Sequence, residues 1–221
     1  NLAGVNTAGD GAQLGNTNSG TQFFAGAGAD TIGFSLGSAA SAAADIQAGS
    51  GNDLITATVV GTGGTLQATT ALAGDGDDTI AITYALSETA GDIVQSGGEG
   101  AVFNGGSGVD SITLLGTVDS AGEFDLGEAQ GGAGVDTITL GSTMATTGLT
   151  TIRGAFNGGL GGDSLIFSGN NFLSGGVSTF VGNGVNGSAG FVYGSGESLI
   201  LGFDTVSVAN EAVTGGQVQK A

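Results

Sequence analysis

The chain has 221 residues, of which 48 are glycine, 20 are acidic and two are basic, and it contains no proline, cysteine or histidine. Its formal net charge of −18 makes nucleic acids and anionic membrane surfaces poor partners and makes a cation the natural one. The lack of cysteine excludes disulfides and thiolate metal sites, and no apolar run approaches the length of a membrane span. Because 39% of the residues are hydrophobic, the chain can still bury a core, and the glycine excess indicates many tight turns.

Residues 1–24 are rich in Gly, Asn, Thr and Gln, and residues 9–13 hold a degenerate glycine-aspartate turn. We expect an N-terminal degenerate coil or cap there. The chain begins at Asn1, with neither Met nor a basic and apolar leader. We therefore expect a processed mature chain or a piece of a longer one.

Residues 25–168 carry one nine-residue motif six times. In each copy a small residue and two alternating glycines lead to an aspartate, and an Ile or Leu follows two places later. The copies are AGAGADTIG from Ala25, AGSGNDLIT from Ala48, AGDGDDTIA from Ala73, GGSGVDSIT from Gly105, GGAGVDTIT from Gly131 and GGLGGDSLI from Gly158. They start 23, 25, 32, 26 and 27 residues apart, which suits one copy per coil of a solenoid.

The residues after each aspartate alternate between apolar and small or hydroxylated side chains, as in a half-buried strand. The first apolar position of this strand holds Ile32, Ile55, Ile80, Ile112, Ile138 and Leu165. A second short strand precedes each turn. Three places before the first of the two alternating glycines, which we call the strict glycines, stand Phe23, Ile46, Ala71, Phe103, Ala129 and Phe156. Each coil is therefore predicted as strand, glycine turn, strand and variable return, and stacked coils share a core.

After residue 168 the motif loses its register. Asn186 stands where residues 182–186 should have their aspartate, and Glu197 comes one place early in residues 194–198. We expect divergent C-terminal coils over residues 169–208, which are richer in Phe, Val and Leu and end the stack. Residues 209–221 are expected to be a tail or linker.

The pattern [Ala/Gly]-Gly-x-Gly-x-Asp-x-[Ile/Leu]-x resembles the calcium-binding nonapeptide of the repeats-in-toxin (RTX) family, found in bacterial surface-layer proteins and adhesins. The resemblance implies an all-β, right-handed parallel β-roll or β-helix solenoid with Ca²⁺ between successive turns along one edge. It implies as carboxylate ligands Asp30, Asp53, Asp78, Asp110, Asp136 and Asp163, with Asp77 and Asp75 as outer-shell or extra ligands. The implied carbonyl ligands belong to Gly26, Gly28, Gly49, Gly51, Gly74, Gly76, Gly106, Gly108, Gly132, Gly134, Gly159 and Gly161.

The chemistry of calcium agrees with this pattern, because Ca²⁺ takes about 6–8 oxygen ligands and glycines let the backbone turn its carbonyls inward. RTX nonapeptides run in tandem on both edges, whereas the intervals here predict a single ladder with at most five sites between six turns. The longest interval, between Asp78 and Asp110, holds a candidate decayed turn at residues 98–102 and predicts the least secure site. Ordinary β-turns are the alternative, but six copies with the apolar anchor in register favour a shared ligand.

Without His or Cys the usual nucleophile and base pairs cannot be built, so we do not expect an enzyme. We expect a secreted protein of a bacterial cell surface that folds on calcium and self-assembles with its own copies into a surface layer or filament. One alternative is a calcium-dependent module that binds ice or a cell-surface glycan through threonines such as Thr56 and Thr58, although its threonine columns are interrupted. Another is the calcium-folded tail of a secreted enzyme. Nucleic-acid binding and membrane insertion are not expected.

Overall fold

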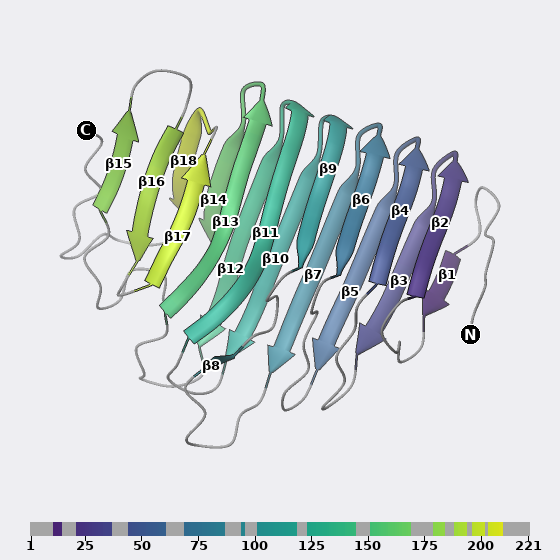
Figure 1. Ribbon diagram of the computed structural model, residues 1–221, viewed down its shortest axis with the longest axis horizontal. Coiled ribbons are helices and arrows are strands. Elements are labelled where there is room, and N and C mark those ends of the chain that lie inside the picture. The colour runs from purple at the N-terminus through teal and green to yellow at the C-terminus, as the bar shows by residue number, and fades with distance from the viewer. Residues whose placement is uncertain are drawn as a thin grey trace.

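The computed structural model describes residues 11–14, 21–36, 44–60, 69–86, 94–95, 101–118, 123–144, 151–168, 179–183, 188–193, 196–201 and 203–209. Within these ranges the chain forms strands and turns and no helix (Figure 1). Most neighbouring strands run parallel, so the fold is a β-solenoid, as the motif spacing predicts.

Two strands flank each of the six copies of the motif. The strands that enter the turns are β2 (Thr21–Ala27), β4 (Ala44–Ser50), β6 (Thr70–Asp75), β9 (Val102–Gly108), β11 (Glu123–Gly134) and β13 (Thr151–Leu160). The strands that leave the turns are β3 (Thr31–Leu36), β5 (Leu54–Val60), β7 (Thr79–Leu86), β10 (Ser111–Val118), β12 (Thr137–Met144) and β14 (Ser164–Ser168). The predicted unit of strand, glycine turn and strand is therefore confirmed in all six copies.

The strands separate into two sheets. The leaving strands form one sheet in the order β1-β3-β5-β7-β10-β12-β14-β18, which includes β1 (Gly11–Leu14) and β18 (Thr205–Ala209). The entering strands form the other sheet, in the order β2-β4-β6-β9-β11-β13, and β8 (Val94–Gln95) pairs with β11 beside it. Figure 1 shows one sheet behind the other, with the glycine turns at the same end of every coil. All six turns therefore line one edge of the solenoid.

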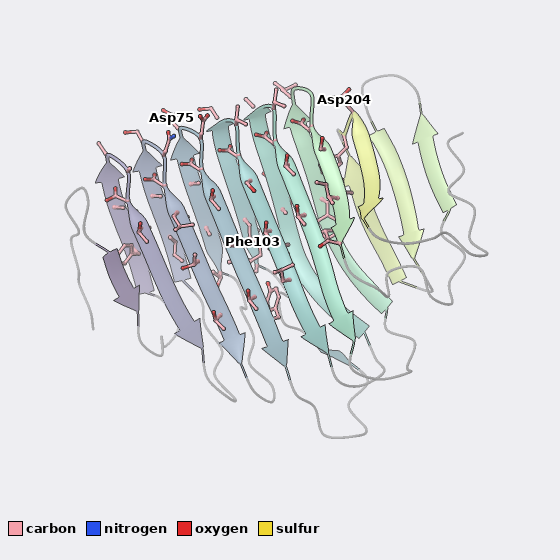
Figure 2. The ribbon with its side chains drawn as sticks, turned by 180° about the vertical axis from the view of Figure 1, so that it is seen from behind. Asp75, Phe103 and Asp204 are labelled. Carbon is pink, nitrogen blue, oxygen red and sulfur yellow. The ribbon has the colours of Figure 1, made fainter. Side chains whose placement is uncertain are left out.

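The register is constant from coil to coil, so equivalent motif positions lie side by side. The column on the leaving strands is Ile32, Ile55, Ile80, Ile112, Ile138 and Leu165, and each is at most 1% exposed. The facing column is Phe23, Ile46, Ala71, Phe103, Ala129 and Phe156, of which Phe103 is labelled in Figure 2. Both columns were predictable from the alternation, and together they form the continuous core that a single coil cannot build.

The N-terminal degenerate turn adds one strand to the solenoid. β1 pairs in parallel with β3, and Gly11 lies beside Thr31. A degenerate first coil would pair in this way. β2 begins at Thr21, inside the predicted 1–24 segment, and residues 1–10 and 15–20 of that segment lie outside the described ranges.

The C-terminal segment is only partly parallel. β15 (Thr179–Asn183), β16 (Ser188–Tyr193) and β17 (Gly196–Leu201) pair antiparallel with one another, and β17 joins the entering sheet beside β13. β18 pairs in parallel with β14. The antiparallel pairing was not predicted, although the two-residue link between Tyr193 and Gly196 carries its signal, because antiparallel strands need only a short turn.

Candidate functional site

Each turn depends on two glycines that no other residue can replace without strain. In the first copy Gly26 and Gly28 have φ values of 114° and 115°, and the strict glycines of all six copies have positive φ. A side chain at Gly49 would also overlap the carbonyl oxygen of Gly26 in the neighbouring coil. The glycines thus permit both the backbone conformation and the close stacking of the coils.

The glycine carbonyls that the sequence implies as ligands point along the stack. The carbonyl oxygens of Gly26, Gly49, Gly74, Gly106 and Gly132 each face the equivalent glycine of the next coil, and so do those of Gly28, Gly51, Gly76, Gly108 and Gly134. Two columns of carbonyl oxygens therefore run between the coils at the turn edge. Each of these oxygens packs against the backbone of the equivalent glycine in the next coil.

The aspartate that ends each turn is buried and joined to its equivalent in the next coil. Asp30, Asp53, Asp78, Asp110, Asp136 and Asp163 are at most 3% exposed. The backbone N–H of each of the first five donates to Oδ1 of the next, over 2.7 Å to Asp53, 2.7 Å to Asp78, 2.9 Å to Asp110, 2.9 Å to Asp136 and 2.8 Å to Asp163. We call this line of six carboxylates the aspartate ladder.

The longest interval in the chain leaves no gap in the aspartate ladder. β7 pairs directly with β10, and β6 with β9, so the third and fourth copies are neighbours in space. Of the residues between β7 and β9, Val94 and Gln95 form β8, which pairs with β11. The bond between Asp78 and Asp110 is within 0.2 Å of the others in length, so the ladder of hydrogen bonds continues through this rung.

The second carboxylate oxygen of the ladder has no hydrogen-bond partner in the described residues. Oδ2 of Asp53, Asp78, Asp110, Asp136 and Asp163 is buried in this state, and so are both oxygens of Asp30. Neighbouring strands lie about 4.8 Å apart, so two charged carboxylates in adjacent coils repel by about 3 kcal/mol at an effective dielectric constant of about 20. A fully charged ladder is therefore unfavourable until a cation or protons neutralise it.

The pKa values of the inner ladder aspartates are shifted in the direction that burial and charge repulsion predict. Burial raises the pKa of Asp53, Asp78, Asp110 and Asp136, the N–H bond from the preceding rung lowers it, and neighbouring carboxylates raise it. The effect is largest at Asp110, whose pKa rises to about 6. The charged form of these side chains is thus disfavoured relative to a free aspartate.

The described part of the chain supplies almost no positive charge. None of the six motif copies contains Lys, Arg or His. The only basic residue in the described ranges is Arg153, on β13, and the other basic residue of the chain is Lys220. Neutralising charge for the ladder therefore has to come from outside the motif copies.

In the fourth and fifth coils, a carboxylate oxygen and a carbonyl oxygen lie close to the glycine that begins the motif. A Cβ on Gly105 would lie 2.5 Å from Oδ2 of Asp110 and 2.7 Å from the carbonyl oxygen of Gly131. A Cβ on Gly131 would lie 2.7 Å from Oδ2 of Asp136 and would also meet the carbonyl oxygen of Gly158. The lack of a side chain at Gly105 and Gly131 thus lets the ladder carboxylate and the carbonyl oxygen of the next coil pack closely against the turn backbone.

No three His, Cys, Asp or Glu side chains in the described ranges converge as a metal-binding group. The reason is geometric, because each coil contributes one ladder carboxylate and the carboxylates lie in a line. A cation between two coils would therefore take most of its oxygen ligands from the backbone.

Asp75 and Asp77 form a separate, solvent-facing row at the turn edge (Figure 2 labels Asp75). Ser107 Oγ donates to Asp75 over 2.6 Å, and the N–H of Val109 donates to Asp77 over 2.9 Å. The N–H of Asp77 donates to the side-chain oxygen of Asn52 over 3.1 Å. This row spans only the second to fourth coils, so these carboxylates lie outside the buried ladder.

Asp204 is a further rung that the motif search misses. The N–H of Asp163 donates to Asp204 Oδ2 over 3.2 Å, and the N–H of Asp204 donates to the carbonyl oxygen of Asp163 over 3.0 Å. Asp204 is exposed and lies at the same turn edge (Figure 2). Its signal is the sequence Asp-Thr-Val, which repeats the Asp-Thr-Ile of three motif copies; Gly202 keeps the glycine two places before the aspartate, and the glycine four places before it is replaced by Ile200.

Comparisons with known proteins add no relative. No protein-family model matches the chain, and neither the curated proteins nor the solved structures contain a match. Among the described residues, no helix is long and apolar enough to cross a membrane. The likeness to the RTX nonapeptide therefore rests on the motif, to which the structure adds a parallel β-solenoid with the six motif turns along one edge.

Proposed function

We propose that this chain is an extracellular structural protein of a bacterial surface, which folds when Ca²⁺ occupies the aspartate ladder and then self-assembles into a surface layer or filament. The supporting observation is the uninterrupted ladder itself, in which buried carboxylate oxygens from Asp30 to Asp163 lack a partner in the described residues. A chain with 20 acidic and two basic residues draws its counter-charge from solution. Ca²⁺ suits the turns better than Mg²⁺, because it accepts many carbonyl ligands in irregular geometry.

Folding and binding are coupled in this proposal because every ligand set spans two coils. The stacked carbonyls and carboxylates come together only when the coils are stacked, so the unfolded chain offers no equivalent site. A ligand that binds only the folded state stabilises it by about 4 kcal/mol per site at a thousand times its dissociation constant. The chain would thus stay loose where calcium is scarce and fold where calcium is plentiful.

Assembly would proceed through the ends of the stack. In the described residues the leaving sheet ends at β1 and β18, and the entering sheet ends at β2 and, through its antiparallel extension, at β15. Edge strands carry backbone groups that can pair with another chain. Pairing of unlike ends joins copies head to tail, which generates a filament or lattice and not a closed dimer.

The first test is calcium-dependent folding. Circular dichroism of the dialysed, metal-free chain should show a weak β signal that grows on addition of Ca²⁺, with Mg²⁺ as the ionic control. Electron microscopy of the same samples should show ordered assemblies only with calcium. A β signal that is the same with and without calcium would contradict the proposal.

A calcium-dependent binding module remains a second candidate, because the outer face of the leaving sheet carries a column of hydroxyl groups. The residues in register directly after the aspartates are Thr31, Leu54, Thr79, Ser111, Thr137, Ser164 and Thr205. Only Leu54 lacks a hydroxyl. Such a column, with hydroxyls about 4.8 Å apart, could face ice or a glycan. Thermal hysteresis in the calcium-loaded protein would support this function over a purely structural one.

A further inference from the structure

The residue directly before each ladder aspartate differs along the stack. We call this place position five of the motif, and the six copies hold there Ala29, Asn52, Asp77, Val109, Val135 and Gly162. Only the second and third copies have a side-chain oxygen at position five. The turns therefore share their glycines and their ladder aspartate, but they differ in whether position five can accept a hydrogen bond.

Where position five carries an oxygen, that oxygen joins two turns. Asn52 Oδ1 accepts from the N–H of Asp77 over 3.1 Å, and Asp77 Oδ1 accepts from the N–H of Val109 over 2.9 Å. The side chain of Asn52 lies across the next turn, because a Cβ on Gly76 would come within 3.2 Å of its Oδ1. In these bonds the later coil donates to the earlier one, whereas in the aspartate ladder the earlier coil donates to the later one.

The other turns cannot make this bond, for a chemical reason. Ala29, Val109 and Val135 have hydrocarbon side chains, which accept no hydrogen bond. The N–H groups of Asn52, Val135 and Gly162 therefore find no acceptor at position five of the coil before them.

The backbone of the later coils would allow the bond. A Cβ on Gly134 would overlap the carbonyl oxygen of Gly108, just as a Cβ on Gly76 would overlap that of Gly51, so the turns stack in the same way in both places. Val109 is 57% exposed, so an asparagine of similar size can replace it without entering the core. What the fourth coil lacks is only the acceptor atom.

We infer that position five is a strap position, at which a side-chain oxygen ties one turn to the next, and that the turn edge consequently opens more readily at the fifth and sixth coils than at the third and fourth. In a solenoid each coil is stabilised by its contacts with its neighbours, so one hydrogen bond between two turns acts locally. Such a bond lowers the population of the locally open state. The inference concerns the stacked coils themselves and does not depend on which cation binds them.

The test is hydrogen exchange of single turn amides, measured by NMR on the folded full chain with Ca²⁺ present. The amides of Asp77 and Val109 should be better protected than those of Val135 and Gly162. Val109→Asn should slow exchange at Val135 by about 3–10-fold, because it supplies the missing acceptor. Val109→Ala is the matched control, since it removes the valine without adding an acceptor, and it should leave the Val135 amide unchanged.

A second pair of variants removes an existing strap. Asp77→Ala should speed exchange at the Val109 amide by a similar factor, whereas Asp77→Asn, which keeps the side-chain oxygen, should not. Equal exchange at Val135 in the wild type and in Val109→Asn, or at Val109 in the wild type and in Asp77→Ala, would overturn the inference. These measurements need only a folded chain, so their failure leaves the proposed calcium function standing, and a chain that folds without calcium would contradict that function but not the strap.

Discussion

The backbone N–H of Asp78 donates a 2.9 Å hydrogen bond to Oδ1 of Asp110, although 32 residues separate the two in sequence. The same bond joins rungs that lie 23 to 27 residues apart elsewhere in the ladder. Constant geometry across unequal intervals means that the stacking of the turns, and not the length of the returns, determines where each carboxylate lies. The turn edge therefore keeps the same geometry in each of the six copies of the motif.

Replacing one ladder carboxylate by its amide should separate its structural role from its charge. In Asp110→Asn the side-chain oxygen can still accept from Asp78, but the charge is gone. We expect the variant to be more stable than the wild type without calcium, by an amount of the order of 1–3 kcal/mol, and to gain less stability from calcium. Urea denaturation with and without calcium measures both effects. Asp45→Asn, on β4 away from the turns, is the matched control and should behave as the wild type does in both conditions.

The metal-free protein should become more stable as the pH falls toward 4.5. The folded pKa of Asp110, about 6, lies above its ordinary value of 3.8, and the pKa values of Asp53, Asp78 and Asp136 are raised in the same sense. A raised carboxyl pKa means that the folded state binds more protons, so this contribution is present at low pH and is lost as the pH rises through 6. Thermal unfolding of the dialysed protein at pH 4.5 and 7.5 checks the sign, and greater stability at pH 7.5 would contradict it.

The strict glycines should tolerate no side chain. In Gly106→Ala the backbone would keep a φ near 110° while the new Cβ meets the carbonyl oxygen of Gly74. We expect a loss of at least about 2–3 kcal/mol, and loss of the fold if the coils cannot separate locally. Gly162→Ala, at an open turn position, should stay within about 0.5 kcal/mol of the wild type. Urea midpoints of the calcium-loaded variants make the comparison.

The core column should be sensitive to truncation in every coil. Ile80 lies in the third coil and is fully buried, so Ile80→Ala should lower the free energy of unfolding by about 2–5 kcal/mol. Val135 is 55% exposed at the turn edge, and Val135→Ala should change stability by less than about 0.5 kcal/mol. A similar loss in both variants, measured by urea denaturation, would show that the apolar columns are not the core of the solenoid.

Asp204 should protect the last glycine turn from opening. Asp204→Ala removes the acceptor of the Asp163 N–H, so the amide of Asp163 should exchange with deuterium faster, by up to about tenfold for a bond worth about 1 kcal/mol. Asp75→Ala, at an exposed carboxylate of the outer row, should leave the Asp163 amide unchanged. Equal protection of Asp163 in wild type and Asp204→Ala would mean that Asp204 is not a rung of the ladder.

Most of the solenoid could be predicted because its information is local. The strict glycines specify a turn, the alternation after each aspartate specifies a strand, and the equal offset of the apolar anchor specifies which face is buried. The antiparallel run from β15 to β17 and the rung at Asp204 could not be found in this way. Asp204 pairs with Asp163, which lies 41 residues earlier. β15, β16 and β17 are close in sequence, but they do not carry the motif from which the other strands were predicted.

The sequence by itself determined the repeated coil, its buried columns and the presence of one acidic position per turn, since each follows from the periodicity and conformational limits of single residues. Only the tertiary structure decided that the third and fourth copies are neighbours across their long interval, because strand pairing does not depend on the length of the segment that connects the strands. It alone also decided that the ladder carboxylates from Asp53 to Asp163 each accept a hydrogen bond from the preceding coil's backbone with one oxygen and leave the other buried. Hydrogen-bond partners in different coils are set by stacking, which no single copy of the motif encodes.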